Sequence, residues 1–155
     1  MARLYDFLTT WRLDAPIDSV WEVLHDAARY TDWWPGVRSV TRLEPGEPSG
    51  AGSLARYSWS STLPYTLTFD VRVTRVERPG LLEGSATGEL EGTGTWRLYA
   101  ADDGGTTAVY HWRVRATKRW MRWLDPLLRP LFVWSHNRVM SRGAVGLRHR
   151  LAASG

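Results

Sequence analysis

Residues 118–151 constrain the fold most, because they read mainly as one helix with more apolar surface than a solvated helix carries. Large apolar side chains crowd its opening, at Trp120, Met121, Trp123, Leu124, Leu127, Leu128, Leu131, Phe132, Val133 and Trp134. Further along, His136, Gly143 and Gly146 make the inward face small and partly polar. We therefore predict that other elements cover this helix and that it forms a lid over a space.

Alternating apolar residues between regularly spaced turn residues indicate an antiparallel meander in the middle of the chain. We predict strands near residues 37–43, 53–61, 65–77, 81–87, 90–100 and 106–116. A further strand is expected at residues 4–13, followed by two short helices that end at Trp33, Trp34 and Pro35. Asp14 is predicted to cap the first of these helices.

The strands at 81–87 and 90–100 carry mainly small residues where side chains should face inward: Leu82, Gly84, Ala86, Gly88, Leu90, Gly92 and Gly94. Glycine leaves no side chain to fill the interior. Set opposite Gly143 and Gly146, this part of the sheet would leave volume unoccupied. The alternative is close packing, in which the glycines let the helix backbone approach the sheet or mark bulges. Both interpretations stay open, and we favour the cavity.

The chain of 155 residues is predicted to be a single domain spanning residues 1–155. It contains no cysteine, which excludes disulfides, Cys-ligated metals and thiol nucleophiles. The four histidines lie on separate predicted elements without metal-ligand spacing, so we expect neither a metal nor a cofactor. Without a signal peptide or an apolar run long enough to span a bilayer, the protein is expected to be soluble and cytoplasmic.

The net charge of +4 would allow attraction to nucleic acid or to an anionic membrane. Much of the basic charge follows Arg113, however, where a solvated helix face explains it. The glycine-rich residues 84–94 lack the lysine and the following helix of a phosphate-binding loop. Nucleic acid is therefore not an expected partner.

Ten tryptophans in a small domain indicate an unusually aromatic core or an aromatic-lined cavity. Strand parity and helix position select the residues that we predict to line it and to contact a ligand: Trp34, Tyr57, Trp59, Phe69, Trp96, Tyr110, Trp112, Phe132, His136 and Met140. His136 and Tyr57 are the candidate catalytic residues. A histidine there could act as a general acid or base, or simply hydrogen-bond a strand carbonyl or a nearby side chain.

A family resemblance joins these features. The order of elements (β-α-α-β6-α) comes with a characteristic N-terminal signature: Ala15-Pro16, Val20-Trp21-Glu22-Val23-Leu24, then Asp26, Tyr30, Trp33, Trp34, Pro35, Gly36 and Val37. In these respects the chain resembles the START/Bet v 1-like (SRPBCC) superfamily, and within it the polyketide cyclase/dehydrase-type branch. The resemblance implies an α+β helix-grip fold, with a curved seven-stranded antiparallel sheet wrapped around the long C-terminal helix. It also implies a cavity for lipids, sterols, polyketides or other aromatic molecules.

Three functions follow from this resemblance. The first is binding of a hydrophobic small molecule, and the second is polyketide cyclase, aromatase or dehydratase activity through substrate orientation and acid–base catalysis. The third is a lipid-transfer or membrane-associated module. It rests on residues 118–123, where basic residues alternate with Trp120 and Trp123 in the manner of a membrane-surface segment. This segment is expected to be a cavity gate, a homodimer contact or a site of peripheral membrane contact.

Overall fold

A computed structural model describes residues 4–60 and 66–154. The elements follow in the order β1 (Tyr5–Leu13), α1 (Ile17–His25), the 3₁₀ helix η1 (Ala27–Asp32), β2 (Val37–Glu44), β3 (Leu54–Ser60), β4 (Thr66–Glu77), β5 (Leu81–Gly88), β6 (Leu90–Ala100), β7 (Thr106–Ala116), α2 (Arg119–Trp123) and α3 (Asp125–Ser154). The predicted strands are confirmed to within a residue wherever the structure describes them. The predicted turn at residues 62–64 and the strand ends at 61 and 65 lie outside the described residues.

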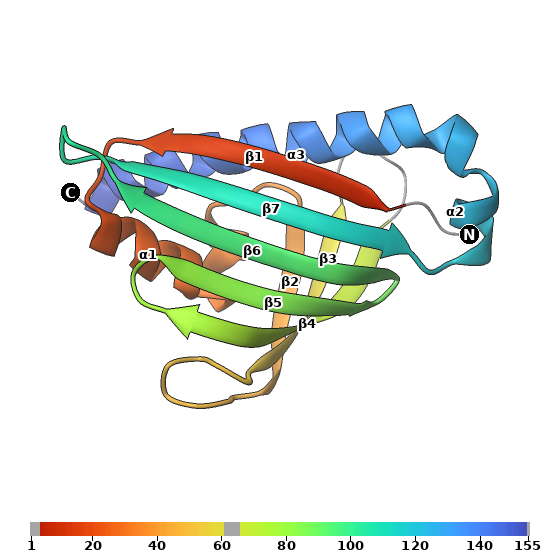
Figure 1. The fold of residues 1–155 in the computed structure, drawn as a ribbon, viewed down its shortest axis with the longest axis horizontal. Coiled ribbons are helices and arrows are strands. Elements are labelled where there is room, and N and C mark those ends of the chain that lie inside the picture. Colours follow the sequence, from red (N-terminus) through yellow and green to blue (C-terminus); the bar gives the residue numbers. More distant parts are fainter. Residues whose placement is uncertain (1–3, 61–65, 155) are drawn as a thin grey trace.

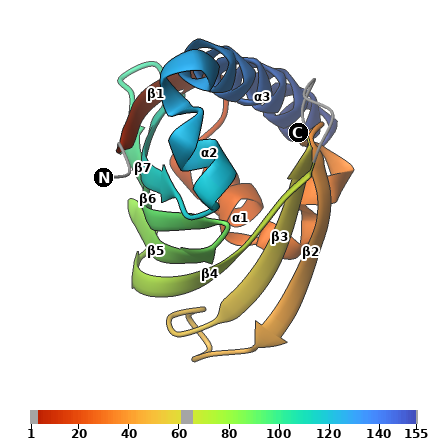
Figure 2. The same ribbon diagram turned by 90° about the vertical axis from the view of Figure 1, so that its right-hand side faces the viewer.

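The seven strands form one antiparallel sheet in the order β1-β7-β6-β5-β4-β3-β2. Figure 1 shows α3 running along the sheet beside β1, the first strand of this order. Viewed from the α2 end, the sheet curls into a trough, and α3 crosses its open side between β1 and β2 (Figure 2). This is the expected α+β helix-grip fold.

The solid core lies at the end of the trough where α1 and η1 meet the second half of α3. It contains Leu13, Val20, Trp21, Leu24 and Leu147, none of them more than 2% exposed. In α1 the apolar positions Ile17, Val20, Trp21 and Leu24 recur at helical spacing, so a single face of this helix is buried there.

Gly143 and Gly146 of α3 belong to this packed end. A Cβ atom at Gly146 would lie 1.8 Å from the carbonyl oxygen of Trp33, and one at Gly143 would lie 2.5 Å from the Trp34 ring. For these two glycines the close-packing interpretation is therefore the correct one. They bring the helix against the turn that follows η1, and they do not widen the cavity.

The start of one helix differs from the sequence prediction. Asp14 does not cap α1, because the helix begins at Ile17 with Pro16 in the capping position and no side-chain hydrogen bond there. The long C-terminal helix is divided at Leu124 into α2 and α3, and Pro130 is accommodated within α3. No helix among the described residues is long and apolar enough to cross a membrane.

Candidate ligand-binding cavity

A cavity of about 380 Å³ lies between the inner face of the sheet, the first half of α3 and the α1–η1 segment. Residues from every strand and from α2 reach its wall. All ten residues that the sequence predicts as lining residues lie there: Trp34, Tyr57, Trp59, Phe69, Trp96, Tyr110, Trp112, Phe132, His136 and Met140. The prediction that they contact a ligand remains a prediction.

Aromatic rings from adjacent strands, and from β4 and β7 across the curved sheet, contact one another along the sheet side of the cavity. The ring centroids of Trp96 and Tyr110 are 4.4 Å apart, and Phe69 lies 5.7 Å from Trp112 and 5.9 Å from Tyr57. Strand register explains this wall, because Trp96 pairs with Tyr110 and Tyr57 pairs with Phe69 across neighbouring strands. Such ring pairs stabilise one another by about 0.5–1.5 kcal/mol each beyond the apolar area that they bury.

Glycines in the sheet make room for these rings. A Cβ atom at Gly94 of β6 would lie 2.7 Å from the Tyr110 hydroxyl oxygen and 2.9 Å from the Trp112 ring. Gly94 pairs with Trp112 across the β6–β7 ladder, so the indole extends over the backbone of β6. Gly94 therefore serves the cavity indirectly, by leaving room for the Tyr110 and Trp112 side chains on its wall.

His136 projects from α3 into the cavity wall. Its ring stacks on Phe7 of β1, with centroids 3.8 Å apart and planes inclined by 15°. Its Nε2 atom is buried and has no hydrogen-bond partner among the described residues. Burial lowers the pKa of His136 to about 4, because the charged imidazolium loses its hydration. At neutral pH the ring is therefore uncharged.

The tyrosine hydroxyls of the wall are also neutral. Burial raises the pKa of Tyr57 to about 12, and it raises the pKa of Tyr110 further. No hydrogen bond among the described residues engages either hydroxyl, and the Trp59 Nε1 atom is buried without a partner there. Trp34 differs, since its Nε1 donates to the Val139 carbonyl at 3.0 Å and ties the ring to α3.

The two ends of the cavity differ in polarity. At one end, Arg42 and Glu47 approach the wall near the loop between β2 and β3. There His25 Nε2 lies 2.7 Å from the Ser49 carbonyl oxygen and connects α1 to this loop. The α2 end is apolar and is lined by residues such as Met121 and Phe132. A ligand that bears one polar end has a defined orientation in such a space.

The sequence prediction missed several wall residues, above all Phe7, Tyr5 and Val139. Phe7 could have been found, because the alternation in β1 places it on the inward face with Tyr5. Its contact with His136 could not, since it depends on how α3 lies across β1. Among residues 4–60 and 66–154, no group of three His, Asp or Glu side chains could hold a metal ion.

A helix-grip domain with an enclosed aromatic cavity defines the class of protein. A family model described as "Polyketide cyclase / dehydrase and lipid transport" matches residues 6–151. The chain therefore belongs to this family. No curated protein matches its sequence.

Solved structures show the same fold at low sequence identity. The Zhui aromatase/cyclase from Streptomyces sp. R1128 is 18% identical with a TM-score of 0.79, and the match covers 97% of this chain and 94% of that one. A START superfamily protein from Mycobacterium smegmatis is 12% identical with a TM-score of 0.78, covering 97% and 99%. The di-domain ARO/CYC BexL is 19% identical with a TM-score of 0.71, and the match covers 94% of this chain and 49% of BexL.

Proposed function

We propose that the protein binds an uncharged, largely aromatic small molecule in this cavity. The observation that carries the proposal is a wall of stacked aromatic rings whose tyrosine hydroxyls and imidazole are neutral at physiological pH, with His136 the clearest case. Away from the end where Arg42 and Glu47 reach the wall, a charged group placed beside these rings would lose its hydration without gaining a partner charge. A polycyclic or polyketide-like ligand with a few oxygen atoms meets both requirements.

The cavity volume and the polar groups without a hydrogen-bond partner restrict the range of possible ligands further. About 380 Å³ falls within the range of about 300–1,000 Å³ for small-molecule pockets. Trp59 Nε1 can donate only, whereas the neutral His136 ring can donate or accept at Nε2 according to its tautomer. A ligand carbonyl or phenol oxygen near these groups would provide the missing hydrogen bonds.

Tryptophan fluorescence tests the proposal, because Trp34, Trp59, Trp96 and Trp112 all line the cavity. We expect saturable quenching by uncharged polycyclic phenols such as 2-naphthol. The matched carboxylate, 2-naphthoate, is expected to bind at least tenfold more weakly, since burying its charge is costly. Equal affinity for the two compounds, or no saturable quenching by any polycyclic phenol, would contradict the proposal.

A second candidate function is cyclisation of a polyketide-like chain, favoured by the unpartnered His136 Nε2 in the cavity wall. The neutral imidazole would accept a proton from an acidic carbon between two carbonyl groups, while the Tyr57 hydroxyl donates to the carbonyl that is attacked. We expect His136→Gln and Tyr57→Phe to lower turnover at least a hundredfold with ligand binding retained. Normal turnover by both variants would remove these assignments.

A further inference from the structure

The outer side of α2 and of the first half of α3 is unusually apolar. Its exposed side chains are Trp120 (45%), Trp123 (84%), Leu127 (78%), Leu131 (41%) and Trp134 (49%). Within α3, Leu127, Leu131 and Trp134 recur at intervals of three or four residues, so they share one face of this helix. Trp120 and Trp123 belong to α2, which precedes it. Together with Arg119 and Arg122, these five residues form what we call the α2–α3 surface.

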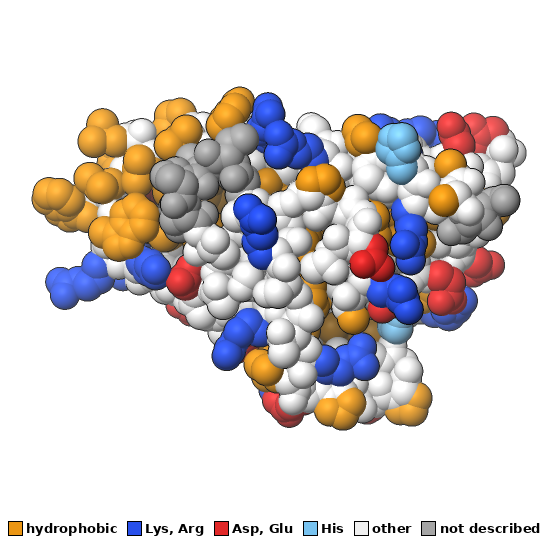
Figure 3. All heavy atoms as spheres, turned by 180° about the vertical axis from the view of Figure 1, so that it is seen from behind, with side chains coloured by type: hydrophobic (Ala, Val, Ile, Leu, Met, Phe, Trp, Pro, Cys, Tyr) orange, Lys and Arg blue, Asp and Glu red, His pale blue; other side chains and the backbone are white. Residues whose placement is uncertain are grey.

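The α2–α3 surface lies directly outside the apolar end of the cavity. Met121 and Phe132, which belong to the same two helices, face inward and line the cavity wall. These two helices therefore carry cavity-lining side chains on one side and the α2–α3 surface on the other. Figure 3 shows hydrophobic side chains gathered at this end of the molecule, with basic side chains beside them.

The charge around the surface is strongly one-sided. Residues 115–138 include six arginines and lysines but only one acidic residue, Asp125. Asp125 is buried and is bound to the Tyr5 hydroxyl and to Arg129. Lys118 pairs with Glu89, but no ion pair among the described residues involves Arg119 or Arg122. These two guanidinium groups remain available to an external anion.

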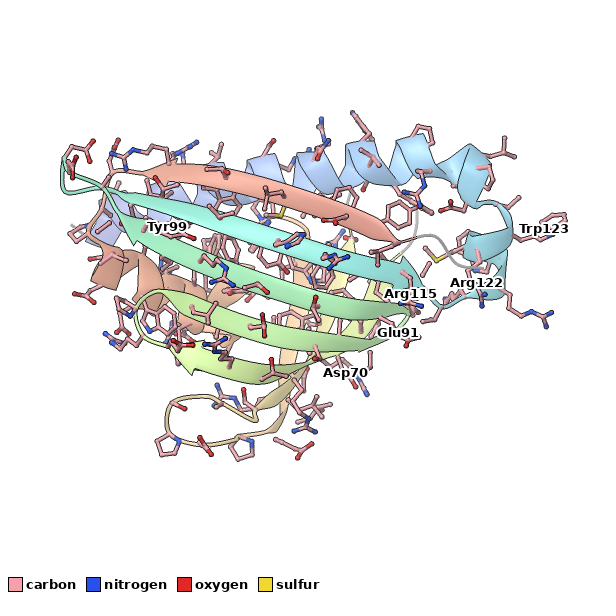
Figure 4. The ribbon with its side chains drawn as sticks, viewed as in Figure 1. Asp70, Glu91, Tyr99, Arg115, Arg122 and Trp123 are labelled. Atoms are coloured by element: carbon pink, nitrogen blue, oxygen red, sulfur yellow. The ribbon has the colours of Figure 1, made fainter. Side chains whose placement is uncertain are left out.

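We propose that the α2–α3 surface docks on an anionic phospholipid membrane and places the apolar end of the cavity against the bilayer. Trp123 and Leu127 enter the boundary between headgroups and acyl chains, and Arg119 and Arg122 contact lipid phosphates. Interfacial helices combine exposed Trp and Leu with flanking basic residues in this way. In Figure 4 Trp123 and Arg122 extend from the same end of the molecule, beyond the sheet.

A second copy of the chain fits this surface less well. In a two-fold symmetric contact each patch faces its own copy, so Arg119 and Arg122 would approach their equivalents. Like charges brought together in an interface oppose association. A membrane containing anionic lipids supplies both the apolar layer and the opposite charge, which a second copy does not.

Vesicle flotation tests this inference with the full chain and without any cavity ligand. The two vesicle types are pure phosphatidylcholine and phosphatidylcholine mixed with one-third phosphatidylglycerol. We expect binding to the anionic vesicles and its loss at high salt. Because each basic residue near such a surface strengthens binding about fivefold, Arg119→Glu with Arg122→Glu should weaken it at least tenfold. Trp123→Ser with Leu127→Ser should have an effect of similar size.

Tyr99→Ser is the matched control. Tyr99 is 53% exposed and lies at the opposite end of the molecule from Trp123 (Figure 4). The Tyr99→Ser variant should float with anionic vesicles as the unchanged protein does. Absence of binding to anionic vesicles, or equal binding by all variants, would overturn the inference. So would a dimer that Trp123→Ser abolishes without any vesicle binding. Naphthol quenching without vesicles tests the proposed ligand binding separately.

Discussion

The two halves of α3 differ in how closely they pack against the rest of the protein. In the second half, Gly143, Gly146 and Leu147 bring the helix into direct contact with the turn after η1, and Leu147 is fully buried. In the first half, Phe132 and His136 face a cavity of about 380 Å³. The two glycines thus lie where the helix is tightly packed, and the two large rings lie where it faces open space. Small residues allow backbones to approach, whereas large rings hold the helix and the sheet apart.

Stability and binding therefore depend on different halves of the same helix. The second half contributes the closest packing, and the first half forms one wall of the cavity and, on its other side, the α2–α3 surface. Substitutions in the second half should therefore change the free energy of unfolding most. Substitutions in the first half should change ligand or membrane affinity more than stability.

The largest effect is expected from Gly146→Ala. Its new Cβ atom would lie 1.8 Å from a backbone oxygen, which cannot move away without displacing the Trp33–Trp34 turn. We expect a loss of more than about 3 kcal/mol, beyond the usual cost of overpacking. Urea denaturation measures it, and Val145→Ala, one residue away and 52% exposed, is the control with little change. A stable Gly146→Ala protein would contradict the close packing described here.

Truncation of one large apolar side chain in each half compares the two directly. Leu147→Ala should cost about 3 kcal/mol, because the fully buried side chain leaves a new cavity in a tight core. Phe132→Ala should cost only about 1 kcal/mol, less than a typical core phenylalanine, since one side of its ring already faces empty space. Equal losses in urea denaturation would show that the first half is packed as tightly as the second.

A smaller effect is expected from the titration of His136. Its folded pKa of about 4 lies below the ordinary value of 6.5, so the unfolded state binds more protons between these pH values. The stability that it contributes is complete above about pH 6.5 and is lost as the pH falls to about 4. We expect a loss of up to about 3 kcal/mol across this window, since each pKa unit corresponds to about 1.4 kcal/mol.

His136→Gln removes this titration and is the control. The difference in unfolding free energy between the unchanged protein and this variant should decline as the pH falls from 7 to 4. Stability curves that stay parallel over this range would mean that the imidazole is not desolvated in the folded protein.

The smallest effect on stability is expected from Trp123→Ser. The side chain is 84% exposed and has few contacts to lose, so the free energy of unfolding should change by less than about 0.5 kcal/mol. Thermal denaturation measures it. A clear loss of stability would mean that Trp123 packs within the molecule, and that the reduced vesicle binding of its variant has another cause.

The periodicity of the apolar residues and the alternation along each strand were enough to predict most of the fold. The alternation in β4 and β7 placed Phe69, Tyr110 and Trp112 on the inward face, and the long apolar helix required a sheet to cover it. Contacts between distant elements could not be predicted in this way. The helix glycines, for example, lie against Trp33 and Trp34, more than a hundred residues earlier, and their spacing gives no sign of that partner.

The candidate site was predicted to a similar extent. The positions of its wall residues follow from strand parity, which is a local property. The neutral state of His136 does not, because it depends on burial and on the stacked Phe7 ring supplied by β1. The exposure of Trp123 and Leu127 likewise depends on which face of the helix the sheet covers.

The strand order has a consequence for synthesis of the chain. β1 is synthesised before the other strands, yet its partner in the sheet is β7. Tyr5 therefore cannot pair with Val114 until about a hundred further residues have been made. α3, which closes the trough, is made later still. Until these last residues leave the ribosome, the aromatic inner face of the sheet has no cover, and such a surface is prone to aggregation. A hydrophobic ligand that bound at this stage would shield the nascent sheet and would be enclosed when α3 docked.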